Sequence, residues 1–176
     1  MTDEPSPGAE PSAQNLLLLT GLSGAGKSTV LGVLEDLGWE TIDNFPVRFL
    51  ESLVGSAPDP ARASQAPLAI GFDTRTRGFV PADIIELGKS LAARDDIATT
   101  FLFLDCASGE LERRYNETRR RHPMARDRAV HEAIKAEREL LEPLRRWADM
   151  VIDTSVLSTN ELQGHVRDLF AKSAQG

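Results

Sequence analysis

Residues 20–29 read TGLSGAGKST and directly follow the four leucines of residues 16–19. Glycines let a backbone turn tightly, so that successive N–H groups point at one anion, and a helix that follows adds its positive dipole end. The stretch therefore predicts a phosphate-binding loop, the P-loop. It matches the pattern G-x-x-x-x-G-K-[ST] at Gly21, Gly26, Lys27 and Ser28.

The loop predicts specific roles for its last two residues. Lys27 supplies a mobile positive charge for the β and γ phosphates, and the Ser28 hydroxyl is a candidate ligand of Mg²⁺. An ordinary glycine turn entering a helix is the alternative, but the position between a strand and an amphipathic helix favours phosphate binding. We expect nucleotide contacts along the whole loop, at Gly21, Leu22, Ser23, Gly24, Ala25, Gly26, Lys27 and Ser28.

Composition indicates a compact globular protein. The 176 residues suit one domain, and 41% hydrophobic residues are enough for a core of ordinary size. Cys106 is the only cysteine, so a reducing compartment, the cytoplasm, is expected. The net charge of −7 gives no overall electrostatic attraction for nucleic acid, and no apolar run is long enough to span a membrane.

The order of apolar segments predicts an α/β fold. Strands expected at 15–20, 39–43, 68–73, 99–105 and 150–154 alternate with segments of helical period. Several of these strands are continuously apolar, as in a parallel sheet that is buried on both faces. We therefore predict a five-stranded parallel sheet with helices on both faces in one domain, residues 15–172. Residues 1–14 are expected to form a disordered tail, and the proline-rich segment 56–67 a surface loop.

A nucleotide site of this kind also needs a carboxylate at the end of a neighbouring strand, to hold the metal through water. Asp73 and Asp105 both end predicted strands, although either aspartate could instead cap a turn or helix. We favour Asp73 because a cluster of hydrogen-bond donors follows it directly. That cluster, Thr74, Arg75 and Thr76, is expected to contact the nucleotide together with Asp73.

Polar side chains also end the second predicted strand. Asp43 and Asn44 precede Pro46, at the rim where ligands bind in open α/β sheets. They are candidates for orienting an acceptor hydroxyl or water. The alternative is that one of them caps a short helix that begins near Pro46.

Residues 111–123 contain five arginines. A solvated helix face explains part of this segment, since Glu110 with Arg114 and Glu117 with Arg121 are i,i+4 pairs. Arg119 and Arg120 have no acidic residue four positions before them. We therefore take Arg119 and Arg120 as candidates for closing over the transferring phosphate.

Six segments in this order and spacing resemble the nucleotide-binding protein family of RapZ and YvcJ, which includes an RNase adapter. The resemblance covers about residues 15–170, and the segments after the first are more specific than the P-loop alone. They are GLSGAGKS (21–28), IDNFP (42–46), FDTR (72–75), RRYNETRRRHP (113–123), LLEPLR (140–145) and ADMVIDTS (148–155).

The resemblance implies a P-loop fold similar to small kinases, with nucleotide contacts at Gly21–Ser28 and at Asp73–Thr76. It implies binding and slow hydrolysis of ATP and GTP with Mg²⁺, by a regulatory module. Members of this family carry a further C-terminal domain, absent from this chain, that RNA or protein partners are expected to need. Two alternatives stay open: a small-molecule kinase, and an RNA-regulatory adapter that uses nucleotide as a switch. The choice between ATP and GTP and the oligomeric state stay open too.

The arginine segment yields a discriminating prediction. Arg119→Ala and Arg120→Ala should each lower turnover and leave nucleotide affinity nearly intact, because a closing contact forms fully only around the transferring phosphate. Arg121→Ala should cost about 0.3 to 0.5 kcal/mol of stability and almost no activity, as for an exposed helix pair. Single-turnover rates and melting temperatures decide this, and equal activity in all three variants would reduce the segment to a solvated face.

Overall fold

The structure is a computed structural model that describes residues 13–55, 57–118 and 129–171. Its centre is a five-stranded sheet in the order β2-β3-β1-β4-β5, in which every neighbouring pair is parallel. The predicted five-stranded parallel sheet is confirmed. The strands are β1 (Gln14–Gly21), β2 (Glu40–Asp43), β3 (Leu68–Gly71), β4 (Ile97–Asp105) and β5 (Met150–Asp153).

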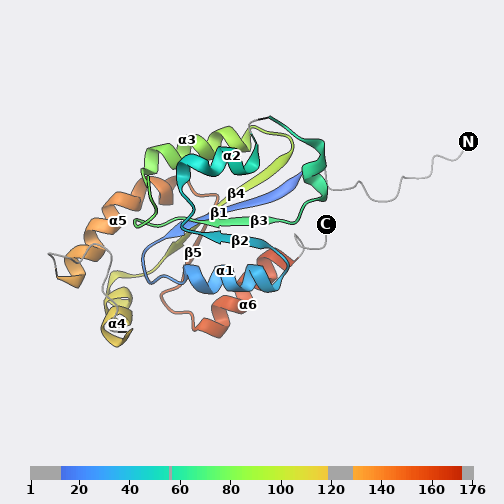
Figure 1. Cartoon of the computed structure of the whole chain (residues 1–176). Coiled ribbons are helices and arrows are strands. Elements are labelled where there is room, and N and C mark those ends of the chain that lie inside the picture. The colour runs from blue at the N-terminus through green and yellow to red at the C-terminus, as the bar shows by residue number, and fades with distance from the viewer. Residues whose placement is uncertain (1–12, 56, 119–128, 172–176) are drawn as a thin grey trace, which may run out of the picture.

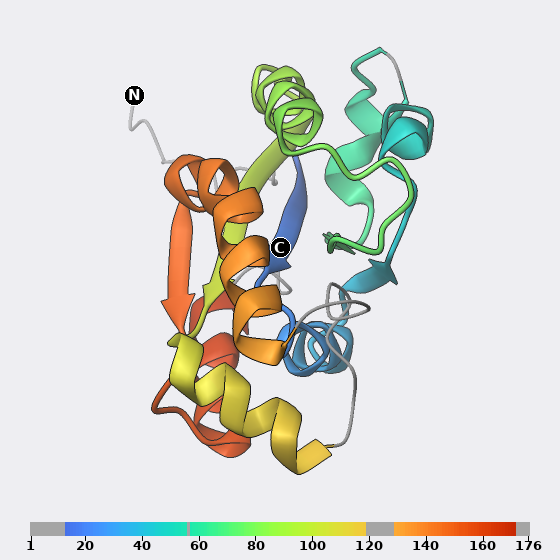
Figure 2. The ribbon, with the colours of Figure 1, turned by 90° about the vertical axis from the view of Figure 1, so that its left-hand side faces the viewer.

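Helices cover both faces of this sheet, as predicted. Figure 1 shows α1 and α6 on one face and α3 and α5 on the other. Figure 2 faces the side of the molecule where α4 and α5 lie. No helix in the described part of the chain is both long enough and apolar enough to cross a membrane. The helices are α1 (Lys27–Asp36), α2 (Leu50–Val54), α3 (Pro81–Ala92), α4 (Ser108–Thr118), α5 (Val130–Trp147) and α6 (Thr159–Phe170), with 3₁₀ turns η1 (Val47–Phe49) and η2 (Pro60–Ser64).

The buried centre of the sheet is the leucine run that precedes the P-loop. Leu17, Leu18 and Leu19 are fully buried, because β1 lies between β3 and β4 and both of its faces are covered by helices. Successive side chains of a strand point to opposite faces, so a strand covered on both faces is apolar at every position. The same reason explains Phe101 and Phe103 on β4, both 1% exposed.

The topology makes the carboxyl end of β1 the expected place for a ligand. β1 pairs with β3 on one side and with β4 on the other. The chain leaves β1 for α1 on one face and leaves β3 for α3 on the opposite face (Figure 1). Ligands of open α/β sheets bind where the connections diverge in this way. The P-loop and the residues after β3 therefore meet at one edge of the sheet.

The first strand begins earlier than expected. The sequence placed Gln14 in the tail, but β1 starts at this residue. The strand begins here because the Gln14 N–H donates to the carbonyl of Asp96 at 3.0 Å. The Gln14 side chain donates to the carbonyl of Ala66 at 2.7 Å and accepts from Arg62 at 3.1 Å. Gln14 is thus a buried polar residue with satisfied hydrogen bonds. The remainder of the predicted tail, up to residue 12, lies outside the described residues.

The segment predicted to be a surface loop contains a turn of helix. The prediction for 56–67 was wrong at η2, where the Asp59 carboxylate accepts from the N–H of Ala61 and Pro60 occupies the first position. Arg62 on η2 is only 9% exposed, and its Nε lies 3.3 Å from Asp96 Oδ2. A buried ion pair therefore anchors this segment beneath the amino end of β4.

Asp96 gives this anchor a testable pH dependence. Hydrogen bonds from Arg94 outweigh burial and lower the pKa of Asp96 to about 2, with a further bond from the Asp59 N–H. A carboxyl whose pKa is lower in the folded chain stabilises it fully above the unfolded pKa, and this stability is lost as pH falls from about 4 towards 2.

We expect Asp96→Asn to lower the free energy of unfolding by about 2 kcal/mol at pH 7, because Arg94 and Arg62 lose a buried partner. The difference from the parent should shrink as pH falls from about 4 towards 2, because the parent carboxyl is protonated in the unfolded chain at a higher pH than in the folded chain. Urea unfolding at pH 7 and at pH 3 measures both. The exposed neighbour Asp95 supplies the control, Asp95→Asn, and equal effects of the two substitutions would contradict the role of Asp96.

Candidate functional site

The glycines of the P-loop serve two physical purposes. Gly24 and Gly26 adopt φ values of 88° and 115°, which side chains of L residues rarely tolerate. Gly21 is needed for space, because a Cβ there would lie 2.4 Å from the carbonyl oxygen of Leu104 on β4. The next N–H, of Leu22, donates to that same carbonyl at 3.1 Å. The loop therefore starts in close contact with the end of β4.

Two side chains from distant segments hold the carbonyls of the loop. Arg114 Nη1 on α4 donates to the carbonyl of Gly24 at 3.0 Å, and the Thr154 hydroxyl after β5 donates to that of Ala25 at 2.6 Å. Arg114 also donates to the Thr154 carbonyl at 2.7 Å and to Glu110 at 3.1 Å. The predicted pair of Glu110 and Arg114 is thus present, but Arg114 is mainly a clamp on the P-loop.

The first turn of α1 has the backbone arrangement that suits binding of an anion. Gly26 occupies the N-cap, where no hydrogen bond from a capping side chain is formed. The first N–H groups of a helix have no partner within the helix, so an uncapped N-terminus favours an anion. Lys27 and Ser28 open this helix, and the Ser28 side chain is exposed.

Lys27 lies between two carboxylates. Its Nζ is 2.9 Å from Asp73 Oδ2 and 3.0 Å from Asp43 Oδ1. The Asp43 carboxylate reaches this position over Gly71 of β3, where a Cβ would lie 2.7 Å from Asp43 Oδ1. The two aspartates come from the carboxyl ends of β2 and β3. The fold thus brings together three residues that the sequence proposed separately.

Asp73 is held in its charged form. Burial by itself raises the pKa of Asp73, but hydrogen bonds from Arg75 and Lys27 together lower it by more. The pKa of Asp73 therefore lies below its usual range. Arg75 Nη2 donates to Asp73 Oδ2 at 3.0 Å and the Arg75 N–H donates to Oδ1 at 2.8 Å. Asp73 therefore organises the turn that follows β3 and pairs with Lys27 at the same time.

The threonines of this turn bond within the protein. Thr76 is 3% exposed, and its hydroxyl accepts from the Asp73 N–H at 2.9 Å. The Thr74 hydroxyl donates to Glu137 at 3.3 Å. Arg75 is the accessible member, with 65% of its side chain exposed. Nucleotide contact at Thr74, Arg75 and Thr76 stays a prediction, and Arg75 is the residue best placed for it.

The structure decides how Asp43 and Asn44 are used locally. Asp43 Oδ1 accepts from the Asn44 N–H at 2.9 Å, and η1 has Pro46 at its N-cap, with no hydrogen bond from a capping side chain. The alternative in which either residue caps this short helix is therefore not observed. Asn44 has φ of 56°, in the left-handed region that asparagine tolerates better than most residues. A role in orienting an acceptor stays a prediction.

Asp105, the other candidate for the metal, has different partners. Its carboxylate accepts from Arg138 Nη1 at 3.0 Å, from Arg145 Nε at 3.0 Å and from the Cys106 N–H at 2.8 Å. Both arginines lie on α5. Asp105 thus fastens α5 to the end of β4, whereas Asp73 pairs with Lys27.

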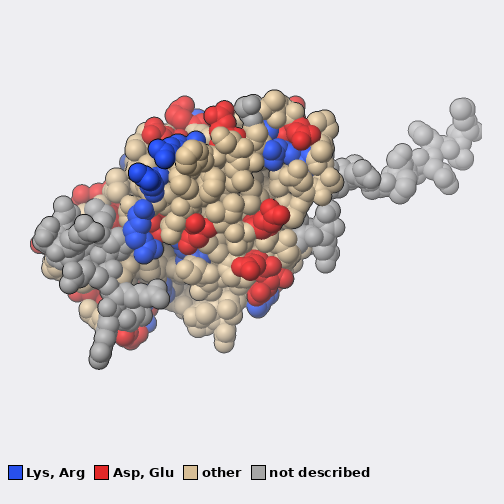
Figure 3. Space-filling model, viewed as in Figure 1, with Lys and Arg blue, Asp and Glu red and all other residues tan. Residues whose placement is uncertain are grey.

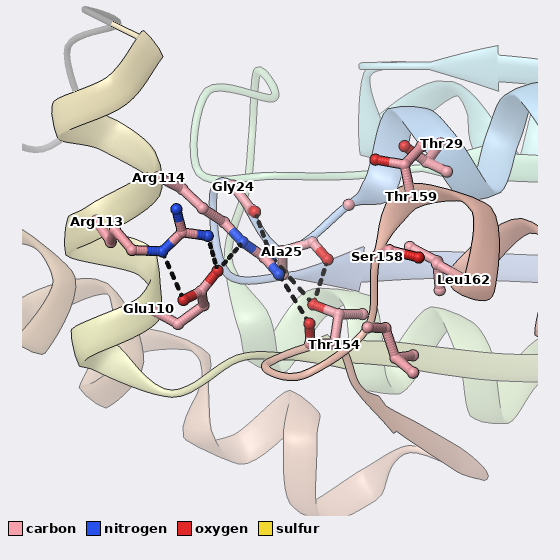
Figure 4. Close-up of a pocket in the computed structure, with 12 residues that line it drawn as sticks. Gly24, Ala25, Thr29, Glu110, Arg113, Arg114, Thr154, Ser158, Thr159 and Leu162 are labelled. Atoms are coloured by element: carbon pink, nitrogen blue, oxygen red, sulfur yellow. Dashed lines mark hydrogen bonds and ion pairs between the residues drawn. The ribbon is translucent and has the colours of Figure 1, made fainter.

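A cavity of about 350 Å³ adjoins the P-loop. Gly24, Ala25 and Gly26 form one wall, and Arg113, Arg114 and Glu110 of α4 line another. The segment after β5 completes it with Thr154, Leu157 and Ser158. Figure 4 shows Arg114 directed from α4 towards Gly24 and Thr154, while Arg113 pairs with Glu110. The sequence predicted nucleotide contacts at the P-loop residues that line this cavity, but it assigned no site role to Arg113, Thr154 or Ser158.

Comparisons with known proteins identify the family of this chain. The sequence model of one protein family, the RapZ-like N-terminal domain, matches residues 14–174. The chain belongs to this family. A nucleotide-binding protein of Erythrobacter litoralis is 64% identical over 159 residues, and one of Novosphingobium aromaticivorans is 61% identical over 163 residues. These alignments cover 89% and 92% of this chain but 51% and 53% of the relatives, so the chain spans about half their length.

Solved structures place this RapZ-like domain among kinase-like folds. A shikimate kinase from Bacteroides thetaiotaomicron superposes with a TM-score of 0.59 at 18% identity, covering 90% of this chain and 97% of the kinase. A gluconokinase from Sinorhizobium meliloti gives a TM-score of 0.53 at 19% identity, with coverage of 95% and 96%. At such identities the likeness shows the fold alone, which confirms the predicted similarity to small kinases.

The site of this RapZ-like domain includes a residue that sequence reasoning missed. Glu137 on α5 is 1% exposed and accepts hydrogen bonds from Ser23 in the P-loop. A signal was present, because Glu137 follows Ile134 by three residues and precedes Leu141 by four, and both of these are buried. A glutamate in the apolar stripe of a helix requires a polar partner inside the protein.

The arginines proposed to close over phosphate, Arg119 and Arg120, lie outside the described residues, as does Arg121. Glu117, the expected partner of Arg121, forms an ion pair with Arg113. The roles of the three arginines stay predictions.

The polar side chains near the P-loop suit a metal ion that binds together with the nucleotide. The described residues contain no group of three or more His, Cys, Asp or Glu side chains arranged to hold a metal. Mg²⁺ usually keeps several waters and takes one or two protein ligands in addition to phosphate oxygens. The Ser28 hydroxyl and, through water, the Asp73 carboxylate suit that coordination. Both assignments stay predictions.

The different partners of Asp73 and Asp105 give a paired prediction. Asp73→Asn should lower hydrolysis more than nucleotide affinity, because a carboxylate that holds a metal through water acts mainly while charge moves in the transition state. Asp105→Asn should instead lower the melting temperature, because two arginines of α5 lose a charged partner. Single-turnover rates, calorimetric titration and melting curves measure these effects. A larger loss of turnover in Asp105→Asn would reverse the assignment.

Proposed function

We propose that the chain is a nucleoside-triphosphate-binding module that hydrolyses ATP and GTP slowly and acts as a regulatory domain. The observation that supports this most is Lys27, which opens an uncapped helix in a P-loop and lies within 3.0 Å of carboxylates from two strand ends. The names of the relatives, which are nucleotide-binding proteins, point the same way.

The cavity beside the P-loop supplies the place for the nucleoside. Gly24, Ala25 and Gly26 belong both to the loop and to the wall of this cavity, so phosphates on the loop would extend directly into it. A volume of about 350 Å³ is in the range of small-molecule sites. Arg113 and Arg114 border the cavity with planar guanidinium groups, which stack well on aromatic rings. P-loop backbone groups read phosphate rather than base, which fits binding of both ATP and GTP.

Each residue has a defined task in this proposal. Lys27 stabilises negative charge on the β and γ phosphates, and the N–H groups at the start of α1 bind the same oxygens. Mg²⁺, when bound with the nucleotide, neutralises phosphate charge. Asp73 keeps Lys27 aligned, and Arg75 beside it offers a second positive charge near the phosphates. Arg119 and Arg120 remain the proposed closing pair.

A small-molecule kinase is the second candidate, and Asp43 favours it. Asp43 lies at the carboxyl end of β2 with 39% of its side chain exposed, and its carboxylate is 3.0 Å from Lys27. A carboxylate in this place can accept a proton from an acceptor hydroxyl that approaches the γ phosphate. A panel of sugars and hydroxy acids separates the two functions, because a kinase forms ADP faster when its acceptor is present.

An RNA-regulatory adapter is the candidate with least support in this chain. The net charge is −7, and on the face that Figure 3 shows the basic side chains form a narrow row at one side rather than a broad basic surface. Non-specific RNA affinity depends on such a surface. RNA and protein partners are therefore proposals for the longer proteins of the family.

Lys27 provides the direct test of the proposed function. Lys27→Ala should weaken triphosphate binding about tenfold or more and reduce hydrolysis about 100-fold or more, because the charge that follows the γ phosphate is removed. Calorimetric titration with ATP and GTP, with and without Mg²⁺, measures the first effect and phosphate release measures the second. Lys89→Ala on the exposed surface of α3 is the matched control.

Melting curves must accompany these measurements, because Lys27→Ala leaves Asp43 and Asp73 without their shared cation. Lys27→Gln keeps most of the side-chain volume and should show the same loss. Unchanged turnover in both variants would contradict the P-loop function.

A further inference from the structure

The carboxylate of Glu137 joins two segments of the proposed nucleotide site. Its Oε1 accepts from the Ser23 N–H at 2.6 Å, and its Oε2 accepts from the Ser23 hydroxyl at 2.7 Å. The same Oε2 accepts from the Thr74 hydroxyl at 3.3 Å. Ser23 belongs to the P-loop and Thr74 to the turn after β3. One side chain on α5 thus bonds to both segments.

Burial decides what this carboxylate can do. Glu137 is 1% exposed, and neither Glu137 nor Ser23 lines the cavity beside the P-loop. A ligand in this cavity therefore does not contact the Glu137 carboxylate. An isolated buried carboxylate would be costly, but hydrogen bonds from a backbone N–H and two hydroxyls compensate its charge. Glu137 is therefore a fixed part of the site.

A neighbouring aromatic residue closes the same region from α4. A Cβ on Gly24 would lie 3.3 Å from the Tyr115 ring, so the ring packs directly against the P-loop. Burial and the nearby charge of Glu137 raise the pKa of Tyr115 above its usual value. Tyr115 and Glu137 thus support the first half of the P-loop from two different helices.

We propose that Glu137 is a positioning residue that sets the P-loop and the 73–76 turn in register, so that Asp73 meets Lys27. This inference rests on the proposed nucleotide function. Ser23 lies four residues before Lys27, and Thr74 directly follows Asp73. A single carboxylate that bonds to Ser23 and Thr74 therefore fixes the position of the P-loop relative to the 73–76 turn. Lys27 and Asp73 lie on these two segments and form an ion pair at 2.9 Å. It also couples α5 to both segments.

Glu137→Gln tests this role with little change of shape. The amide oxygen can still accept from the Ser23 N–H, but its NH₂ group cannot accept from the two hydroxyls. We expect single-turnover hydrolysis to fall about tenfold while the dissociation constant for ATP stays within about twofold, because misalignment acts mainly in the transition state. Glu139→Gln, at an exposed position on the same helix, is the matched control and should match the parent.

Two further variants identify the contact itself. Thr74→Val removes the hydroxyl and keeps the shape, so the double variant with Glu137→Gln should lose no more turnover than Glu137→Gln alone, within about twofold. Glu137→Asp keeps the charge but withdraws the carboxylate by one methylene, and it should show the same fall in turnover with unchanged affinity. It also serves if Glu137→Gln does not fold.

An NMR measurement on the nucleotide-free protein separates failure of this inference from failure of the proposed function. Glu137→Gln should shift the amide resonances of both Ser23 and Thr74, and Glu139→Gln should shift neither. Absence of these shifts overturns the inference even if the parent binds no nucleotide. With an active parent, unchanged turnover in Glu137→Gln overturns it, and so does a loss of affinity that equals the loss of turnover.

Discussion

The P-loop keeps its shape through hydrogen bonds to distant parts of the fold. The Leu22 N–H bonds to the end of β4, and the carbonyls of Gly24 and Ala25 accept from Arg114 and Thr154. These partners lie near one edge of the sheet because β1, β4 and β5 are parallel and in fixed register. A slip of β4 by one residue would reverse its faces and remove the close approach that Gly21 permits. The site therefore depends on the register of the whole sheet.

The helices that cover this edge of the sheet supply the cationic partners of its aspartates. Asp73 follows β3 and Asp105 ends β4, and these strands flank β1 on either side. Asp73 meets Lys27, whereas Asp105 meets Arg138 and Arg145 of α5. Similar carboxylates thus have different partners, because Arg138 and Arg145 of α5 reach Asp105 while Lys27 reaches Asp73. This division leaves one lysine between two acids at the proposed phosphate site.

The kinase-like sheet and the family relatives give complementary information. The fold is shared with shikimate kinase and gluconokinase, and it supplies a P-loop at a strand end. An acceptor site is a separate property, which likeness of fold does not establish. The curated relatives are about twice as long as the aligned part of this chain. Within this chain, the contact of Glu137 with Ser23 ties α5 to the P-loop.

The sequence by itself determined the parallel sheet and the P-loop, because each follows from a local pattern. Continuous apolar runs mark buried strands, and glycine spacing marks the loop. Only the tertiary structure decided that Asp73 pairs with Lys27, that Arg114 donates to the carbonyl of Gly24 and that Glu137 accepts from Ser23. The reason is physical: the contact between Ser23 and Glu137 joins residues 114 positions apart. Local spacing shows that a side chain faces inward, but only the packed fold supplies its partner.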